Sequence, residues 1–341
     1  MKKALIYFLA LFLINSSCSK KQGLNPIDLS NWEFKMISQG DNSPTFRPSK
    51  DSIQFIPILL RKGYPIEQIQ EHLGWSQEEL DEKCEELSKN GFIKKVEGKY
   101  LPTVMVISDK DANQIRQKID PLAREIALAI EQKIDTIKIM TSNTSCLSSF
   151  DFEDLSLLIL SNILLDNGQI RNVENEYLKS ERPLRNGKRY YAAYGEKPND
   201  RTEAWHVYGN QVEMNDGFAM CRYGNERYTD EVIAINDSII AKYKRSGALD
   251  LAYPIFNNQC YVEVLELANY FKPHLIRILS EHTPSLEALY AEMKYTEEVT
   301  YEEFFIWIYH ILYSHTTDIL LESRLLSLPE EKVSFYIVEL E

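Results

Sequence analysis

Glycine and proline are scarce in this chain: there are 13 of each among 341 residues. So little of either excludes a collagen-like or low-complexity protein. Basic residues are also in the minority, with 38 Lys and Arg against 51 Asp and Glu, for a formal charge of −13. The hydrophobic share of 44%, which includes 20 Tyr and 14 Phe, is enough for a core and excludes general disorder. A chain of this length is typical of about two domains.

Short signatures of catalytic and metal sites are missing as well. The sequence contains no GxSxG, P-loop, GxGxxG, HExxH, paired CxxC or EF-hand loop. His310 and His315 lie five residues apart, about 140° apart on a helix, whereas helical metal ligands are spaced by three or four. With 51 acidic residues, no single carboxylate pair stands out as a hydrolytic site. We therefore predict no catalytic residue, no metal site and no cofactor.

The N-terminus has the pattern of an export signal. Lys2 and Lys3 precede an unbroken apolar run from Ala4 to Ile14, and small polar residues follow it. A helix over these eleven residues would be about 16 Å long, half of the ~30 Å that a membrane span requires. The pattern therefore predicts a signal peptide over residues 1–17 and not a transmembrane anchor.

The residues around Cys18 resemble a bacterial lipobox, in which a cysteine is lipidated on sulfur before the signal is cut off. Residues 16–18 fit this motif, whereas Asn15 stands where lipoboxes usually have Leu. The resemblance implies an acylated Cys18, a lipidated tether over residues 18–50 and attachment to a membrane of the bacterial cell envelope. Ser19 in place of Asp further implies sorting to the outer membrane, by similarity to enteric lipoproteins. The alternative is an ordinary secretory signal with an incidental cysteine.

Cleavage would remove Lys2 and Lys3, which leaves 38 − 2 = 36 basic and 51 acidic residues, a balance of −15. A field of this sign repels nucleic acid. Four cysteines would remain, namely Cys84, Cys146, Cys221 and Cys260. Their wide spacing favours small core residues, and an even number outside the cytoplasm also permits disulfides.

Three helices and a hairpin are predicted between residues 51 and 110. The expected elements are helices at 53–61, 65–73 and 76–89, then strands at 92–96 and 99–107 joined at Glu97-Gly98. Gly74 ends the second helix, and Ser76 with Glu79 forms a capping box for the third. This order of elements resembles a winged helix-turn-helix domain.

In DNA-binding members of that family the third helix enters the major groove. Here it carries six acidic side chains against Lys83 and Lys89, a net charge of about −4. Carboxylates held against phosphates oppose the counterion release that drives DNA binding. We therefore predict a structural or protein-contacting module, and no nucleic-acid partner.

Residues 111–341 are predicted to form a larger, mostly helical domain, so that the chain as a whole is α+β. The expected elements are helices at 120–139, 152–165 and 230–245, further helices to about 323, and a strand at 333–338. A Tyr-rich insertion at about 188–228 predicts a small antiparallel sheet, with Gly209-Asn210 and Gly224-Asn225 at tight turns. Before the first domain, Trp32, Phe34 and Met36 alternate as in a short strand.

A basic group rich in arginine and tyrosine lies between residues 179 and 194. Its candidate ligand-binding side chains are Arg182, Arg185, Lys188, Arg189, Tyr190 and Tyr191. Arg forks and Tyr hydroxyls hold carboxylates, phosphates or sulfated sugars. The alternative is a solvated loop whose charges pair with nearby acidic helices.

A second aromatic group follows in the sequence, made of Trp205, His206, Tyr208, Phe218, Tyr223 and Tyr228. It fits either a stacking platform for sugar or peptide or the packed face of the small sheet. Packing in the core is the interpretation that we favour.

Three hypotheses for function follow. The first is a membrane-anchored envelope lipoprotein that acts as a non-enzymatic binding or protein-interaction module, with residues 179–194 as its contact surface for a protein, a peptide or an anionic ligand. The second is an exported hydrolase whose acid and base are scattered Asp or Glu residues. The third is a cytoplasmic winged-helix regulator, which requires that the signal be misread.

Overall fold

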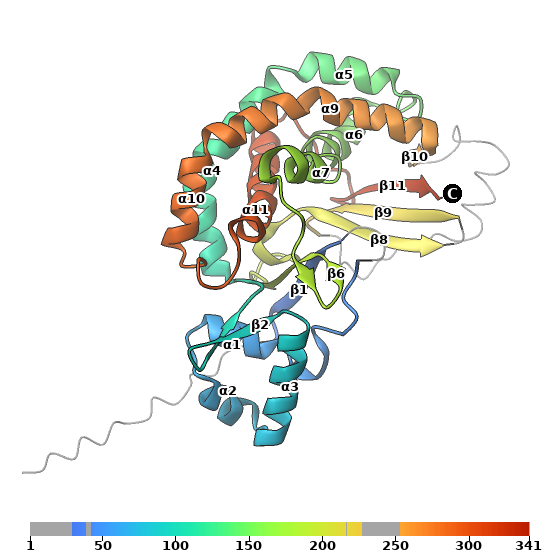
Figure 1. The fold of residues 1–341 in the computed structure, drawn as a ribbon. Coiled ribbons are helices and arrows are strands. Elements are labelled where there is room, and N and C mark those ends of the chain that lie inside the picture. The colour runs from blue at the N-terminus through green and yellow to red at the C-terminus, as the bar shows by residue number, and fades with distance from the viewer. Residues whose placement is uncertain (1–28, 39–41, 216, 227–252, 341) are drawn as a thin grey trace, which may run out of the picture.

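The computed structural model describes residues 29–38, 42–215, 217–226 and 253–340. The protein is of the α+β class and mostly helical, as predicted, with small sheets between helices (Figure 1). Cys18, Tyr228 and the helix expected at 230–245 lie outside the described residues. Among the described helices, none combines the length and the apolar character that a membrane span needs.

The N-terminal unit contains the expected helices and hairpin, at the lower end of the molecule in Figure 1. Its elements are η1 (Lys50–Ser52), α1 (Phe55–Arg61), α2 (Ile66–Leu73), α3 (Gln77–Lys89), β2 (Ile93–Val96) and β3 (Lys99–Pro102). Gly74 ends α2 with φ 69°, a conformation that favours glycine, and Ser76 and Glu79 form the capping box of α3. The order helix, helix, helix, hairpin is therefore present.

A three-stranded sheet connects this unit to the rest of the chain. It consists of β1 (Trp32–Ile37), β7 (Tyr191–Glu196) and β4 (Met105–Ile107), with β7 in the middle, antiparallel to β1 and parallel to β4. Successive side chains of a strand point to opposite faces, so Tyr194 packs in the core of the N-terminal unit and Ala193 in the larger core. The predicted strand 99–107 is wrong in one respect: residues 105–107 leave the hairpin and pair with β7.

Helices make up most of the larger unit. They are α4 (Asp109–Glu131), α5 (Ile134–Asn143), α9 (Asn258–Glu281), α10 (Thr283–Glu292) and α11 (Tyr301–Glu322). In Figure 1, α4, α9 and α10 form an arc around α11, whose side chains are buried on nearly every side. The helix predicted at 120–139 is wrong at both ends. The capping box of Ser108 and Asp111 starts α4 at Asp109, eleven residues before the predicted start. The helix is then interrupted at residues 132–133, and α5 continues beyond the predicted end. Pro121 lies inside α4.

The chain that follows α5 adopts an uncommon helical geometry. It consists of α6 (Phe152–Ser156), a π-helical segment η2 (Leu157–Ile163), α7 (Ile170–Asn172) and a second π-helical segment η3 (Val173–Leu178). The whole of η2 is buried, which confirms the prediction of a buried helix at 152–165. Such π-helical turns are rare and occur frequently at functional sites.

A four-stranded sheet packs beside α11 and η2 (Figure 1). Its order is β10 (Ile255–Phe256), β11 (Ser334–Glu339), β9 (Phe218–Gly224) and β8 (Gly209–Asn215). The predicted antiparallel sheet is present, but the prediction for its turns is wrong: Gly209 pairs with Gly224, so both Gly-Asn pairs lie at the open end of the hairpin. The turn itself contains Gly217, with φ 77°. The remaining short elements are β5 (Leu184–Arg185), β6 (Lys188–Arg189) and η4 (Ala204–His206).

One disulfide joins Cys146, in the loop after α5, to Cys260 in the first turn of α9. The two residues are 114 positions apart in the sequence. Cys84 and Cys221 are free and buried, as expected of small core residues. The disulfide therefore fixes the start of α9 against the loop that precedes α6.

Candidate functional site

The basic group predicted as a contact surface is divided among several environments. Arg185, Tyr190 and Tyr191 are buried. Arg182 donates two hydrogen bonds to Glu174, of 2.7 and 2.9 Å. Arg189 lies 2.8 Å from a carboxylate oxygen of Glu181. The group is completed by Lys188, which is half-buried and also has a partner.

Burial also keeps the tyrosine side chains of this group away from solvent and their hydroxyls protonated. It raises the pKa of Tyr190 to about 12 and raises the pKa of Tyr191 further, because the phenolate is poorly solvated there. The six side chains thus do not converge on one accessible site.

The second aromatic group is core, the interpretation that we favoured. Trp205, Tyr208, Phe218 and Tyr223 are all buried. The Trp205 ring packs edge-on against Trp307, at 5.4 Å between centroids, and its indole N–H donates to the carbonyl of Ile107. These rings therefore stabilise the junction of the sheets with α11 and present no stacking platform.

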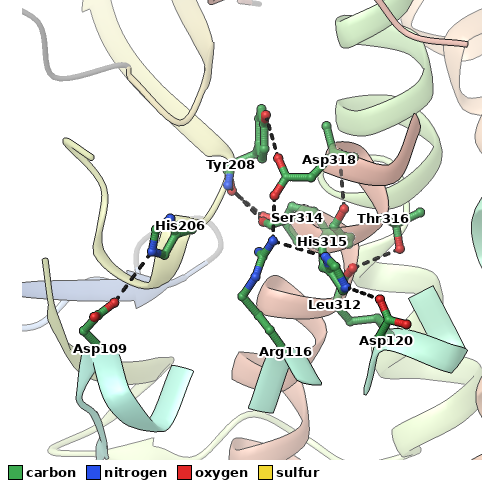
Figure 2. Close-up of polar contacts among 12 residues, drawn as sticks. Asp109, Arg116, Asp120, His206, Tyr208, Leu312, Ser314, His315, Thr316 and Asp318 are labelled. Carbon is green, nitrogen blue, oxygen red and sulfur yellow. Dashed lines mark hydrogen bonds and ion pairs between the residues drawn. The ribbon is translucent and has the colours of Figure 1, made fainter. Parts of the chain in front are cut away.

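Figure 2 shows a polar cluster between α4 and α11 that would be the natural candidate for acid-base chemistry. Arg116 donates from Nη2 to Oδ2 of Asp318 (2.8 Å), and the same nitrogen lies 3.1 Å from Nδ1 of His315. Nδ1 must therefore be the acceptor, and Nε2 of His315 carries the proton and donates to Oδ1 of Asp120 at 2.9 Å. Tyr208 donates its hydroxyl to Asp318.

This bonding fixes His315 as a neutral ring. Burial and the nearby Arg116 both lower the pKa of His315, although Asp120 opposes them. Both ring nitrogens are occupied, which leaves no lone pair for a substrate, so the cluster joins α4 to α11 instead of forming a catalytic base.

The two histidines of α11 lie in separate environments. His310 is buried and its Nδ1 bonds the carbonyl of Ile306, in a separate environment from the network of His315. Within the described ranges, no three His, Cys, Asp or Glu side chains are grouped as metal ligands would be.

A cavity of about 400 Å³ beside the two π-helical segments offers a different chemistry. We call it the Arg171 cavity. Its polar lining residues are Ser38, Asn167, Arg171, Asn172, Arg182, Tyr261 and Asn269, and the apolar ones are Ile37, Ile170 and Leu265. They come from the end of β1, the chain from the end of η2 to α7, the loop before β5 and one face of α9.

Local packing fixes the backbone that carries these side chains, while Asn167, Arg171, Tyr261 and Asn269 are themselves exposed. Gly168 follows η2 so closely that a Cβ atom there would lie 2.3 Å from the carbonyl oxygen of Ile163. The next residue, Gln169, donates from Nε2 to the carbonyl of Ala268 at 2.5 Å and so ties this turn to α9. Tyr261, Leu265 and Asn269 are spaced by four, which places them along one face of α9.

Hydrogen-bonding groups of this cavity are left unused by the protein. The side chains of Asn167, Arg171, Tyr261 and Asn269 have no hydrogen bond or ion pair within the described part of the chain. Arg182 holds Glu174 through Nε and one terminal nitrogen, while its buried Nη1 has no acceptor among the described residues. No Asp or Glu among the residues that the structure describes lines the cavity. The site therefore offers a guanidinium, amides and a hydroxyl to an anionic or hydroxyl-bearing ligand.

Only Arg182 of this lining was among the residues predicted from the sequence. Asn167 belongs to an Asp-Asn-Gly sequence that is typical of a turn, and Arg171 and Asn269 lie about a hundred residues apart in featureless polar contexts. No local signal links them, because the cavity exists only once α7 packs on α9. Comparison of the chain with models of protein families, with curated proteins and with solved structures gave no match.

Proposed function

We propose that this protein is an envelope lipoprotein, anchored through lipid on Cys18, that binds an anionic, hydroxyl-bearing ligand in the Arg171 cavity. The observation that carries the proposal is the guanidinium of Arg171, which lines the cavity, is exposed and has no hydrogen bond or ion pair within the described residues. Among those residues, no Asp or Glu lines the cavity.

The lining selects a class of ligand. A guanidinium pairs with carboxylate, phosphate or sulfate through a planar fork. The amides of Asn167 and Asn269 both donate and accept, as sugar hydroxyls require, and Tyr261 adds an aromatic face. A volume of about 400 Å³ lies within the range of small-molecule sites. An acidic, phosphorylated or sulfated sugar meets all of these conditions.

The same lining favours binding over catalysis. Hydrolysis needs a general acid and a general base, which are supplied by His, Asp, Glu, Lys, Tyr or Cys near the reacting bond. Among the described residues, the Arg171 cavity has no carboxylate, imidazole, amine or thiol in its lining. Tyr261 is the one titratable group besides arginine there, and a lone phenol does not supply both roles.

The disulfide between Cys146 and Cys260 supports the proposed location, because disulfides persist in oxidising compartments. Replacement of Cys18 by Ala tests the anchor. We expect the wild-type protein to enter the detergent phase in a detergent partition experiment and the Cys18→Ala variant to stay in the aqueous phase. Equal partition of the two proteins would contradict the lipid anchor.

Calorimetric titration of the Cys18→Ala protein tests the ligand. The probes are D-glucuronate, D-glucose 6-phosphate and D-glucose 6-sulfate, with D-glucose and inorganic phosphate as references. We expect an acidic sugar to bind best, and Arg171→Ala to weaken it at least tenfold, since hydrogen bonds to charged groups are worth ~1.5–3 kcal/mol.

The matched control is Arg277→Ala, which removes an exposed arginine from α9 and should leave binding unchanged. Absence of binding by all three acidic sugars, or an equal affinity of the Arg171→Ala variant, would refute the proposal.

A further inference from the structure

A second cavity, of about 510 Å³, lies at the junction of the N-terminal unit with the larger one. We call it the junction cavity. Val106 of β4 and Glu196 of β7 line it, and these two strands run parallel and end side by side. Ser108, the N-cap of α4, lines it as well. Ligands of sheets with parallel strands bind outside the carboxyl ends of those strands, where the following helices begin.

Basic side chains outnumber acidic ones around this cavity. Arg61, Lys62, Lys110 and Lys294 line it, together with the acids Asp111 and Glu196. Arg61 is bound by Glu298 at 3.1 Å and by the carbonyl of Met293 at 2.7 Å. The ammonium groups of Lys110 and Lys294 have no hydrogen bond or ion pair within the described residues.

The two acidic side chains are already used by the start of α4. Oδ2 of Asp111 accepts from the backbone N–H of Ser108, and Oε2 of Glu196 accepts from the N–H of Asp109 at 3.1 Å. Glu196 also lies 3.8 Å from Lys62. The positive end of the α4 dipole lies in the same region and is where these two carboxylates accept. Within the described residues, the cavity thus has two exposed lysines, Lys110 and Lys294, whose ammonium groups have no partner.

The floor of the junction cavity is apolar. Val106, Met293 and Trp32 line it and are each at most 6% exposed. Each of these side chains therefore presents only a small apolar area to the cavity, and Lys62 lies 5.1 Å from the centroid of the Trp32 ring. An organic anion with an apolar or aromatic body would contact this area and still reach the lysines, which an inorganic ion would not do.

We infer that the junction cavity is a second ligand site, which takes a small aromatic or apolar anion whose charged group pairs with Lys110 and Lys294. It is separate from the Arg171 cavity, because the two share no lining residue. The inference does not depend on the proposed sugar ligand.

The test uses the fluorescent anion 1-anilinonaphthalene-8-sulfonate with the folded Cys18→Ala protein. We expect saturable binding that the Lys110→Glu/Lys294→Glu variant weakens at least tenfold, and that Lys110→Gln/Lys294→Gln weakens to an intermediate degree. The matched control is Lys89→Glu/Lys99→Glu, which makes the same charge change at exposed lysines outside both cavities and should leave the affinity within twofold.

A neutral dye with the same rings, N-phenyl-1-naphthylamine, separates the apolar from the ionic contribution. We expect it to bind the wild-type protein at least tenfold more weakly than the sulfonate, and to bind the Lys110→Glu/Lys294→Glu variant as it binds the wild type. Equal affinity of the two dyes, or sulfonate binding that the double variant leaves unchanged, would overturn the inference.

The Arg171→Ala variant separates this site from the proposed sugar site. It should leave sulfonate binding intact, so failure of the sugar site and failure of this site can be distinguished. Circular dichroism confirms that each variant is folded.

Discussion

Arg185 of β5 forms a buried ion pair with Glu303 in the first turn of α11, with side chains that are only 4% and 2% exposed. The guanidinium also donates to the carbonyls of Tyr190 at 2.7 Å and Thr103 at 2.8 Å. The other carboxylate oxygen of Glu303 accepts from the N–H of Ala192 on β7. One ion pair therefore joins Thr103, which follows the β2–β3 hairpin, to the central strand β7 and to α11.

Loss of Arg185 should destabilise the protein strongly. In Arg185→Met, the carboxylate of Glu303 stays buried without its cation, and such a change costs ~3–5 kcal/mol. Urea unfolding of the wild type and the variant measures the difference. Arg277→Met, which removes an exposed pair with Glu281 on α9, should cost only ~0.3–0.5 kcal/mol. The double variant Arg185→Met/Glu303→Met should recover much of the loss, and a double variant as unstable as Arg185→Met would contradict this account.

Arg185 also shows where prediction from the sequence ends. Its place in a basic run suggested a ligand contact, but its partner lies 118 residues further along the chain and no local pattern indicates it. The capping box of Ser76 and Glu79, the Gly74 turn and the β2–β3 hairpin were predictable because their determinants lie within a few residues of one another. The π-helical segments and both cavities depend on packing between distant segments, and the sequence therefore did not indicate them.

The Cys146–Cys260 disulfide should contribute to stability, because it closes a loop of 114 residues in the unfolded chain. We expect Cys146→Ser/Cys260→Ser to lose ~2–5 kcal/mol of unfolding free energy. Reductant should lower the melting temperature of the Cys18→Ala protein and leave that of the serine variant unchanged. Thiol labelling under denaturing, non-reducing conditions should modify two cysteines, Cys84 and Cys221. Labelling of four would show that the disulfide is absent.

The stability of the protein should fall on mild acidification. The pKa of His315 is lowered from 6.5 in the folded state, because burial and Arg116 disfavour the imidazolium. The unfolded chain therefore binds a proton first as the pH drops through about 6.5, and this favours unfolding by at most ~1.4 kcal/mol per pH unit for each such histidine. The contribution of His315 to the free energy of unfolding is fully present above pH 6.5 and is lost as the pH falls through the lowered pKa of the folded state.

Urea unfolding at pH 7.5 and 5.5 measures this dependence. His315→Gln should show a smaller loss between the two pH values than the wild type. An equal loss in the wild type and in His315→Gln would show that the ring is not held neutral by burial and Arg116.

A methyl group at Gly168 should damage both the fold and the Arg171 cavity. The added Cβ would lie 2.3 Å from the carbonyl oxygen of Ile163 and 3.1 Å from the side chain of Ala268, so either η2 or α9 must shift. We expect Gly168→Ala to cost at least ~2 kcal/mol in urea unfolding, by overpacking. It should also weaken acidic-sugar binding, because Asn167 and Arg171 flank this turn.

Gly98→Ala is the control. The φ of 82° at Gly98 makes this substitution cost ~1–2 kcal/mol. Among the described residues no atom lies within 4 Å of the new Cβ, so sugar binding should be unchanged. If both variants bound the sugar like the wild type, the close packing of η2 on α9 would not be what shapes the cavity.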